Sequence, residues 1–96
     1  MRIELKKFGT TLTSRQAGKE ASLVISNNVR NLNEEEKIEI DFDGVQTFSP
    51  SWGDEFLSPL VNDYISRIIL LNTENLSVQS SIELLEEIHK VKFTVE

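Results

Sequence analysis

The feature that most constrains the fold is a strict two-residue period in the segment 37–43. Apolar and acidic side chains alternate there, as Ile38, Ile40 and Phe42 against Glu39, Asp41 and Asp43. Such a period is the signature of a β-strand with one buried and one solvated face. A sheet of such strands carries its helices mainly on one side, and this predicts an α/β domain.

Four further segments are expected to be strands. Residues 2–6 repeat the alternation, and the short segment 10–12 is expected to pair with them through a turn at Gly9. Residues 68–71 are apolar on both faces, as in an inner strand, and residues 92–96 alternate again. With three helices between these strands the order is ββαβαβαβ, and we expect a mixed sheet of four or five strands.

The first helix is expected to begin at a capping box formed by Thr13 and Gln16, with Ser14 as the alternative cap. Apolar residues at helical spacings predict its buried face: Ala17, Ala21, Val24, Ile25 and Leu32. Gly18 lies within this helix, where glycine costs about 1 kcal/mol relative to alanine. A residue with this cost is expected to have a packing reason, and Gly18 therefore predicts a close approach to a neighbouring element.

The second helix is predicted to start in the segment 49–55, where Pro50 lies between two cap-forming serines, Ser49 and Ser51. Pro59 interrupts its apolar stripe, so the helix is expected to kink there or to restart with Ser58 as a second cap. The third helix has two candidate caps, Asn75 and Ser77. The residues on its apolar face are expected to be Val78, Ile82, Leu85 and Ile88.

The size and charge of the chain restrict its function. With 96 residues it is expected to form a single domain, residues 1–96, with one core between two packed layers. Its formal net charge of −6 repels phosphate backbones and anionic lipids, so neither nucleic acid nor a membrane is an expected partner. The sequence has no cysteine and no apolar run of signal-peptide or membrane-spanning length. We therefore expect a cytoplasmic protein that is a monomer or a weak dimer.

Several blocks of the sequence resemble STAS-type domains, the fold of anti-sigma factor antagonists, and more closely their STAS-like bacterial relatives of unassigned function. The blocks are Gly9 to Ala21, Ile40-Asp41-Phe42-Asp43-Gly44-Val45 with Phe48-Ser49-Pro50-Ser51, Ile68 to Asn72, and Phe93-Thr94-Val95. The most specific motif is Ser51-Trp52-Gly53-Asp54-Glu55, which is similar to the serine-aromatic-small-Asp-Glu run that opens this helix in the STAS-like relatives. The resemblance implies a single STAS-like domain over nearly the whole chain.

In anti-sigma factor antagonists a serine at this helix start is phosphorylated by a GHKL-type kinase, and the added charge releases the complex. The resemblance assigns that role to Ser51, with Ser49 as a second candidate, although the antagonists usually have Asp-Ser-Ser/Thr-Gly where this chain has Ser49-Pro50-Ser51-Trp52. The alternative interpretation of Ser51 is a simple N-cap, which contributes about 1 kcal/mol to stability.

The resemblance thus implies a non-catalytic regulatory module that docks on a protein partner, which a GHKL-type ATPase or kinase would fit. The residues expected at that contact are Ser49, Ser51, Trp52, Asp54 and Glu55. Two alternatives stay open. One is a small-ligand or nucleotide-binding domain, and the other is an inhibitor or accessory protein of a phage or defence locus.

Trp52 has two interpretations, as an exposed anchor for the partner or as a core residue.

Four acids, Asp41, Asp43, Asp54 and Glu55, are expected near one strand end and helix start, where carboxylates could hold magnesium or calcium. Helix caps, turn hydrogen bonds and a structural pair between Arg15 and Asp54 account for these acids without an ion. We therefore predict no metal and no cofactor.

His89 is the only histidine, and it falls near the end of the third helix, where a positive charge complements the helix dipole. Neither a second histidine nor a cysteine is present to complete a metal site with it. The sequence also lacks a nucleophile elbow, a phosphate-binding glycine loop and a dinucleotide fingerprint. We therefore expect no enzymatic activity.

Overall fold

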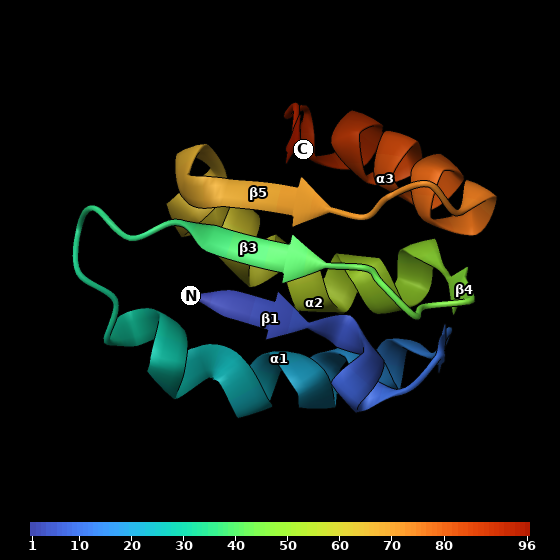
Figure 1. Ribbon diagram of the computed structural model, residues 1–96, viewed down its shortest axis with the longest axis horizontal. Helices are drawn as coiled ribbons and strands as arrows, with labels where there is room; N and C mark the ends of the chain where they lie inside the picture. Colours follow the sequence, from blue (N-terminus) through green and yellow to red (C-terminus); the bar gives the residue numbers. More distant parts are fainter.

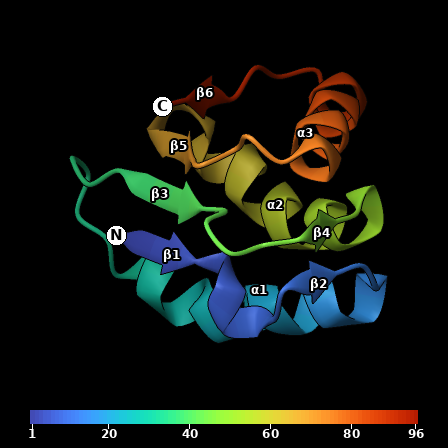
Figure 2. The same ribbon diagram turned by 45° about the vertical axis from the view of Figure 1, so that its right-hand side comes forward.

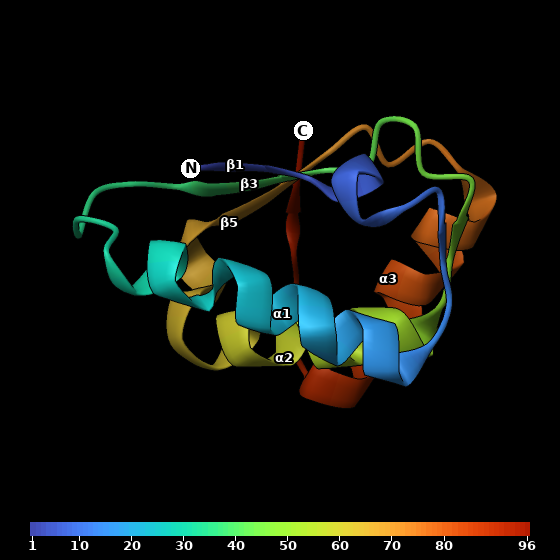
Figure 3. The same ribbon diagram turned by 90° about the horizontal axis from the view of Figure 1, so that it is seen from below.

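The computed structural model describes all 96 residues and shows an α/β fold of two layers, with three helices packed on one face of a parallel sheet. Figure 1 shows the sheet in front of α2, and Figure 3 shows all three helices on the same side of it. The elements are β1 (Arg2–Glu4), β2 (Thr11–Leu12), α1 (Arg15–Arg30), β3 (Ile38–Asp41), β4 (Thr47–Phe48), α2 (Pro50–Tyr64), β5 (Ile68–Leu71), α3 (Leu76–His89) and β6 (Thr94–Val95). Short 3-10 helices at Leu5–Phe8 and Ile65–Arg67 complete them.

The main sheet has the order β1-β3-β5-β6, and all its strands run parallel. The prediction of a mixed sheet is therefore wrong in strand direction. Each crossover between neighbouring strands carries one helix, and such connections are right-handed in nearly all proteins, which places the three helices on one face. The one-sided packing read from the alternating strands is confirmed.

The expected hairpin between the first two strands is also wrong. Instead of a turn at Gly9, the chain leaves β1 through a 3-10 helix that buries Leu5 completely. β2 then pairs in parallel with β4, forming a separate two-stranded sheet that lies beyond the main one (Figure 2). The additional strand β4 was not expected, because Thr47–Phe48 is too short to show a period.

Helix α1 begins at Ser14, whose hydroxyl accepts a hydrogen bond from the amide of Ala17 at 3.1 Å, so the alternative cap is the correct one and Thr13 is not. Its buried residues are Gly18, Ala21, Ile25 and Val29. The expected face was rotated, since Val24 is 69% exposed and Ala17 is also at the surface. This rotation follows from the contact with α2. The side of α1 that faces α2 is the side with Gly18, where the two backbones can approach most closely.

Gly18 makes that approach. A Cβ atom placed on it would lie 2.4 Å from the carbonyl oxygen of Trp52, so the two helices cross backbone against backbone. This confirms the close contact predicted from a glycine inside a helix.

Helix α2 runs from Pro50 to Tyr64 and continues through Pro59. Of the two alternatives offered for Pro59, the restart at Ser58 does not occur, and the Ser58 hydroxyl contacts other side chains instead. Helix α3 is capped by Asn75, whose side chain accepts from the amides of Ser77 and Val78. No helix in the structure has the length and apolarity that a membrane crossing requires.

Candidate functional site: the start of α2

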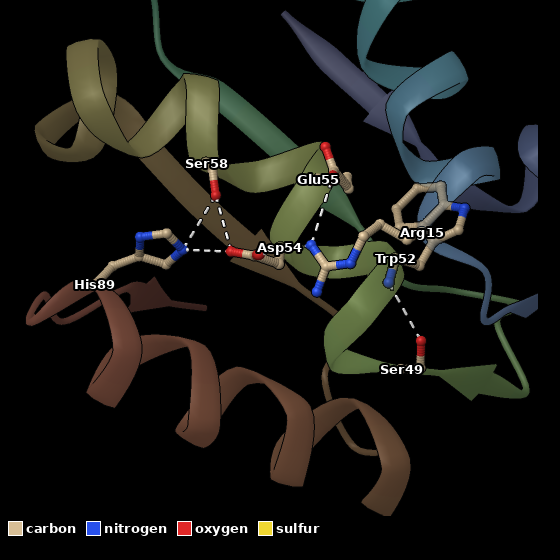
Figure 4. A network of polar contacts seen from close by, with 7 residues as sticks. All are labelled: Arg15, Ser49, Trp52, Asp54, Glu55, Ser58 and His89. Atoms are coloured by element: carbon tan, nitrogen blue, oxygen red, sulfur yellow. Dashed lines mark hydrogen bonds and ion pairs between the residues drawn. The ribbon is translucent and has the colours of Figure 1, made fainter.

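The first turn of α2 is fixed by Ser49, which caps the helix. Its Oγ accepts from the amide of Trp52 at 3.3 Å and donates to the carbonyl oxygen of Thr13 at 2.8 Å. The amide of Ser49 in turn donates to the carbonyl oxygen of Leu12 at 2.9 Å. The helix start is thereby tied to the segment between β2 and α1, and the Ser49 hydroxyl both donates and accepts a hydrogen bond. Figure 4 shows the contact between Ser49 and the amide of Trp52.

Ser51 lies one residue beyond Pro50, the first residue of the helix. The interpretation of Ser51 as the N-cap is therefore wrong, because Ser49 is the cap. Its side chain is half-buried and makes no hydrogen bond within the chain. It shares a face of α2 with Asp54 and Glu55, which lie three and four residues further on. Its amide belongs to the first helical turn, whose N–H groups have no partner inside a helix.

Trp52 points into the core and is only 1% exposed. Its ring stacks on Phe56 with centroids 4.9 Å apart and packs edge-on against Phe48 at 5.9 Å. Phe8 covers it from the first 3-10 helix, at 6.2 Å. A side chain so enclosed cannot anchor a partner, so Trp52 is removed from the predicted contact residues and its alternative interpretation, burial in the core, is correct.

Gly53 explains why a small residue follows the tryptophan in the motif. A Cβ atom there would lie 2.7 Å from the ring of Phe48 and 2.8 Å from the side chain of Leu85 on α3. The Trp52-Gly53 pair therefore forms the crossing point at which α2 contacts α1 on one side and α3 on the other.

Arg15 connects the start of α1 to the exposed side of α2. Its Nη1 lies 2.9 Å from Asp54 Oδ2 and 3.3 Å from Glu55 Oε1. The predicted pair of Arg15 and Asp54 is present, and Glu55 joins it. The hydrogen bond from Arg15 is the main reason that the pKa of Asp54 lies below its usual value; partial burial opposes the shift, and hydrogen bonds from Ser58 and His89 reinforce it.

His89 reaches Asp54 from α3, a contact that the sequence did not reveal. Its Nε2 lies 2.9 Å from Asp54 Oδ1 and 3.2 Å from Ser58 Oγ, while Ser58 Oγ donates to Asp54 Oδ1 at 3.0 Å (Figure 4). In a serine-histidine-aspartate triad the serine and the aspartate use different ring nitrogens, whereas here both meet Nε2. The arrangement matches a structural clamp between helices and not a charge-relay geometry.

The other acids belong to a separate place. Asp41 is buried at the end of β3, where Arg2 Nη2 lies 2.7 Å from its Oδ2 and Asn72 Nδ2 lies 2.7 Å from its Oδ1. Desolvation raises the pKa of Asp41, but hydrogen bonds from Asn72, the amide of Asp43 and Arg2 outweigh it, so the pKa is lowered. The expected gathering of Asp41 and Asp43 with Asp54 and Glu55 does not occur, and no group of three ligand-type side chains could hold a metal ion.

Comparison with known proteins gives one result. A family model described as "STAS-like domain of unknown function (DUF4325)" matches residues 20–79, from α1 to the first turn of α3. The matched stretch contains the segment 51–55, whereas Arg15 and His89, which contact Asp54, lie outside it. No curated protein and no solved structure gave a match. Because the family model covers well over half of the chain, this protein belongs to the STAS-like domains of unknown function.

Proposed function

We propose that this chain is a non-catalytic regulatory module that docks on a protein partner through the start of α2, and that phosphorylation of Ser51 switches the docking. The observation that carries the proposal is the state of the two serines there. The hydroxyl of Ser49 is engaged on both sides, whereas that of Ser51 is unbonded and half-exposed at the second position of a 15-residue helix. Ser51 is therefore the hydroxyl that can be modified without removing the cap.

The electrostatics of this helix start support a switch. A phosphate on Ser51 would gain from the amide of Ser51, the one N–H of the first turn without an acceptor in the chain, and from the positive end of the helix dipole. It would also stand beside Asp54 and Glu55, and like charges at these spacings repel each other. Arg15, which now binds both acids, is placed to turn toward the phosphate instead, so phosphorylation would change the charge pattern of the whole tip.

The partner class follows from the family resemblance. In anti-sigma factor antagonists the corresponding serine meets a GHKL-type kinase, and we propose an ATPase or kinase of this type as the partner here. The proposed contact surface comprises Ser49, Ser51, Asp54 and Glu55, which are all partly exposed. Ser51, Asp54 and Glu55 share one face of α2, and Ser49 caps the same helix.

A small-ligand or nucleotide-binding role receives less support from the geometry. The strand order of the main sheet never reverses, so it has no switch-point crevice of the kind that holds nucleotides in open α/β sheets. The hollow between α1 and α2 measures about 160 Å³, below the range of about 300–1,000 Å³ that is usual for ligand sites. Two larger hollows beside α3, of about 400 and 430 Å³, are lined mainly by polar and charged side chains, whereas ligand sites are lined mainly by apolar ones.

The proposal is tested with a GHKL-type kinase from the source organism and ATP, followed by mapping of phosphate by mass spectrometry. We expect modification at Ser51 and not at Ser49. In binding measurements Ser51→Asp should weaken the complex at least about tenfold, because it adds charge at the contact. Ser66→Asp is the matched control, since Ser66 is exposed in the second 3-10 helix and should leave binding unchanged. Equal binding by both variants, with no phosphate at Ser51, would refute the switch.

A further inference from the structure

Helix α3 exposes a row of apolar side chains that no other element covers. Leu76 is 79%, Leu84 is 42% and Ile88 is 55% exposed. With Ser80 these residues follow one another at four-residue spacing, so they form a single ridge along the helix, the α3 ridge (Leu76, Ser80, Leu84 and Ile88). The ridge was not expected from the sequence, because Ile88 was assigned to the buried face of the helix.

Negative charge runs along one side of the α3 ridge. Glu83 and Glu87 are exposed and each precede a ridge residue by one position, about 100° round the helix. Beyond them lies a groove of about 400 Å³ between α3 and β6, in which Glu83 and Glu86 face the apolar surfaces of Ile82, Phe93 and Val95. Lys92 also lines this groove and lies 3.9 Å from Glu86, but its side chain is 90% exposed and free to move aside.

We propose that the α3 ridge is a docking surface for a basic amphipathic helix of a partner protein. The apolar face of such a helix, with side chains three and four residues apart, would pack along Leu84 and Ile88. Its lysine or arginine side chains would reach Glu83 and Glu87 and lay their aliphatic stems in the groove beside them. An acidic border beside an apolar ridge is complementary to this partner and to few others, and the net charge of −6 strengthens the attraction.

The charges argue against a second copy of the chain as the occupant. A two-fold antiparallel pairing of α3 would bring Glu83 of one copy opposite Glu87 of the other, and two such like-charge contacts would form. Of the two lysines that follow the helix, Lys92 already lies 3.9 Å from Glu86, which leaves Lys90 to offset them.

This surface is distinct from the start of α2. Apart from Leu76 it lies outside residues 20–79, the stretch that the family model matches. The proposal does not depend on Ser51 or on its modification, and the two can fail separately.

The test uses the whole chain and two synthetic amphipathic peptides of roughly 18 residues, or five helical turns. Both have the same leucine face, flanked by lysine in one and by glutamate in the other, and their affinities are measured by fluorescence anisotropy. The chain variants are Leu84→Ser/Ile88→Ser, which removes the apolar ridge, and Glu83→Lys/Glu87→Lys, which reverses its border. The matched control is Leu23→Ser/Val24→Ser on α1, whose side chains are 65% and 69% exposed.

We expect the lysine peptide to bind the natural chain more tightly than the glutamate peptide. The ridge variant should lose at least about tenfold in affinity, the charge-reversed variant should prefer the glutamate peptide, and the α1 control should bind as the natural chain does. All these positions are exposed, so the variants should keep the natural circular dichroism spectrum. The proposal is overturned if the lysine peptide does not bind, or if the ridge variant and the control variant lose peptide affinity equally. It is also overturned if the natural chain sediments as a dimer and the ridge variant sediments as a monomer.

Discussion

At the crossing of α1 and α2 a single hydrogen atom, that of Gly18, occupies the space that any other side chain would need. The nearest atoms belong to the backbone of Trp52, which cannot rotate away as a flexible side chain would. The indole of the same residue is held between Phe8, Phe48 and Phe56, so the backbone of Trp52 is fixed from its other side as well. Gly18 and Trp52 therefore depend on each other, although 33 positions of sequence separate them.

Replacement of this glycine tests that dependence. In an exposed helix Gly→Ala stabilises by about 1 kcal/mol, but we expect Gly18→Ala to lower the free energy of unfolding by about 1–3 kcal/mol, as overpacked cores do. Urea unfolding followed by circular dichroism measures the change. Lys19→Ala, on the exposed side of the same helix, should change the stability by no more than about 0.5 kcal/mol. A stabilised Gly18→Ala variant would show that the two helices have room to separate.

At the scale of the elements, Asp54 is the point where all three helices are connected, through Arg15 on α1 and His89 on α3. Because its folded-state pKa is lowered, the ionised carboxylate stabilises the fold at pH values above the unfolded-state pKa of about 3.9. This stabilisation is lost as the pH falls through the lower, folded-state pKa.

Asp54→Asn should therefore be less stable than the natural chain at neutral pH, and the difference should shrink as the pH falls below about 4. Urea unfolding at a series of pH values measures this difference in stability. Asp41, whose pKa is also lowered, contributes equally to both proteins and cancels from the difference. Asp63→Asn is the control, because Asp63 is exposed on α2 and makes no ion pair. A pH-independent difference would mean that Asp54 acts through packing and not through its charge.

The elements that the sequence predicts well are those with a period long enough to read. β3 and the burial of Ile38 and Ile40 follow from the alternation, but Asp41, predicted on the solvated face, is buried because Arg2 and Asn72 bind its carboxylate. The Arg15–Asp54 pair, predicted as a partner for the acids of the second helix, is present. β2 and β4 have two residues each, so their pairing is decided by the tertiary fold and not by a local pattern. His89 meets Ser58 only because Gly53 lets α3 approach α2 closely, and no spacing in the sequence records that approach.

For the whole molecule, a single cluster of 22 buried apolar residues joins every helix to the main sheet. No part of the chain has a second core, so partial unfolding would expose this cluster at once. Trp52 lies inside it, and as the only tryptophan it reports on its integrity.

We therefore expect cooperative unfolding. Urea transitions followed by tryptophan fluorescence and by far-ultraviolet circular dichroism should have coincident midpoints, because the indole environment and the helices are lost together. Gly18→Ala should move both midpoints to lower urea by the same amount. A fluorescence change that precedes the loss of helix would contradict a single cooperative unit.

The strand order β1-β3-β5-β6 has a consequence for biosynthesis. Position along the chain and position across the sheet coincide, so no strand has to be inserted between two that are already paired. Each strand of the main sheet after β1 pairs with the strand that precedes it in that sheet, and the helix between the two covers their buried side chains. The order in which translation delivers the strands therefore matches their order in the sheet from β1 to β6, and the domain can form as one unit once the last strand is available.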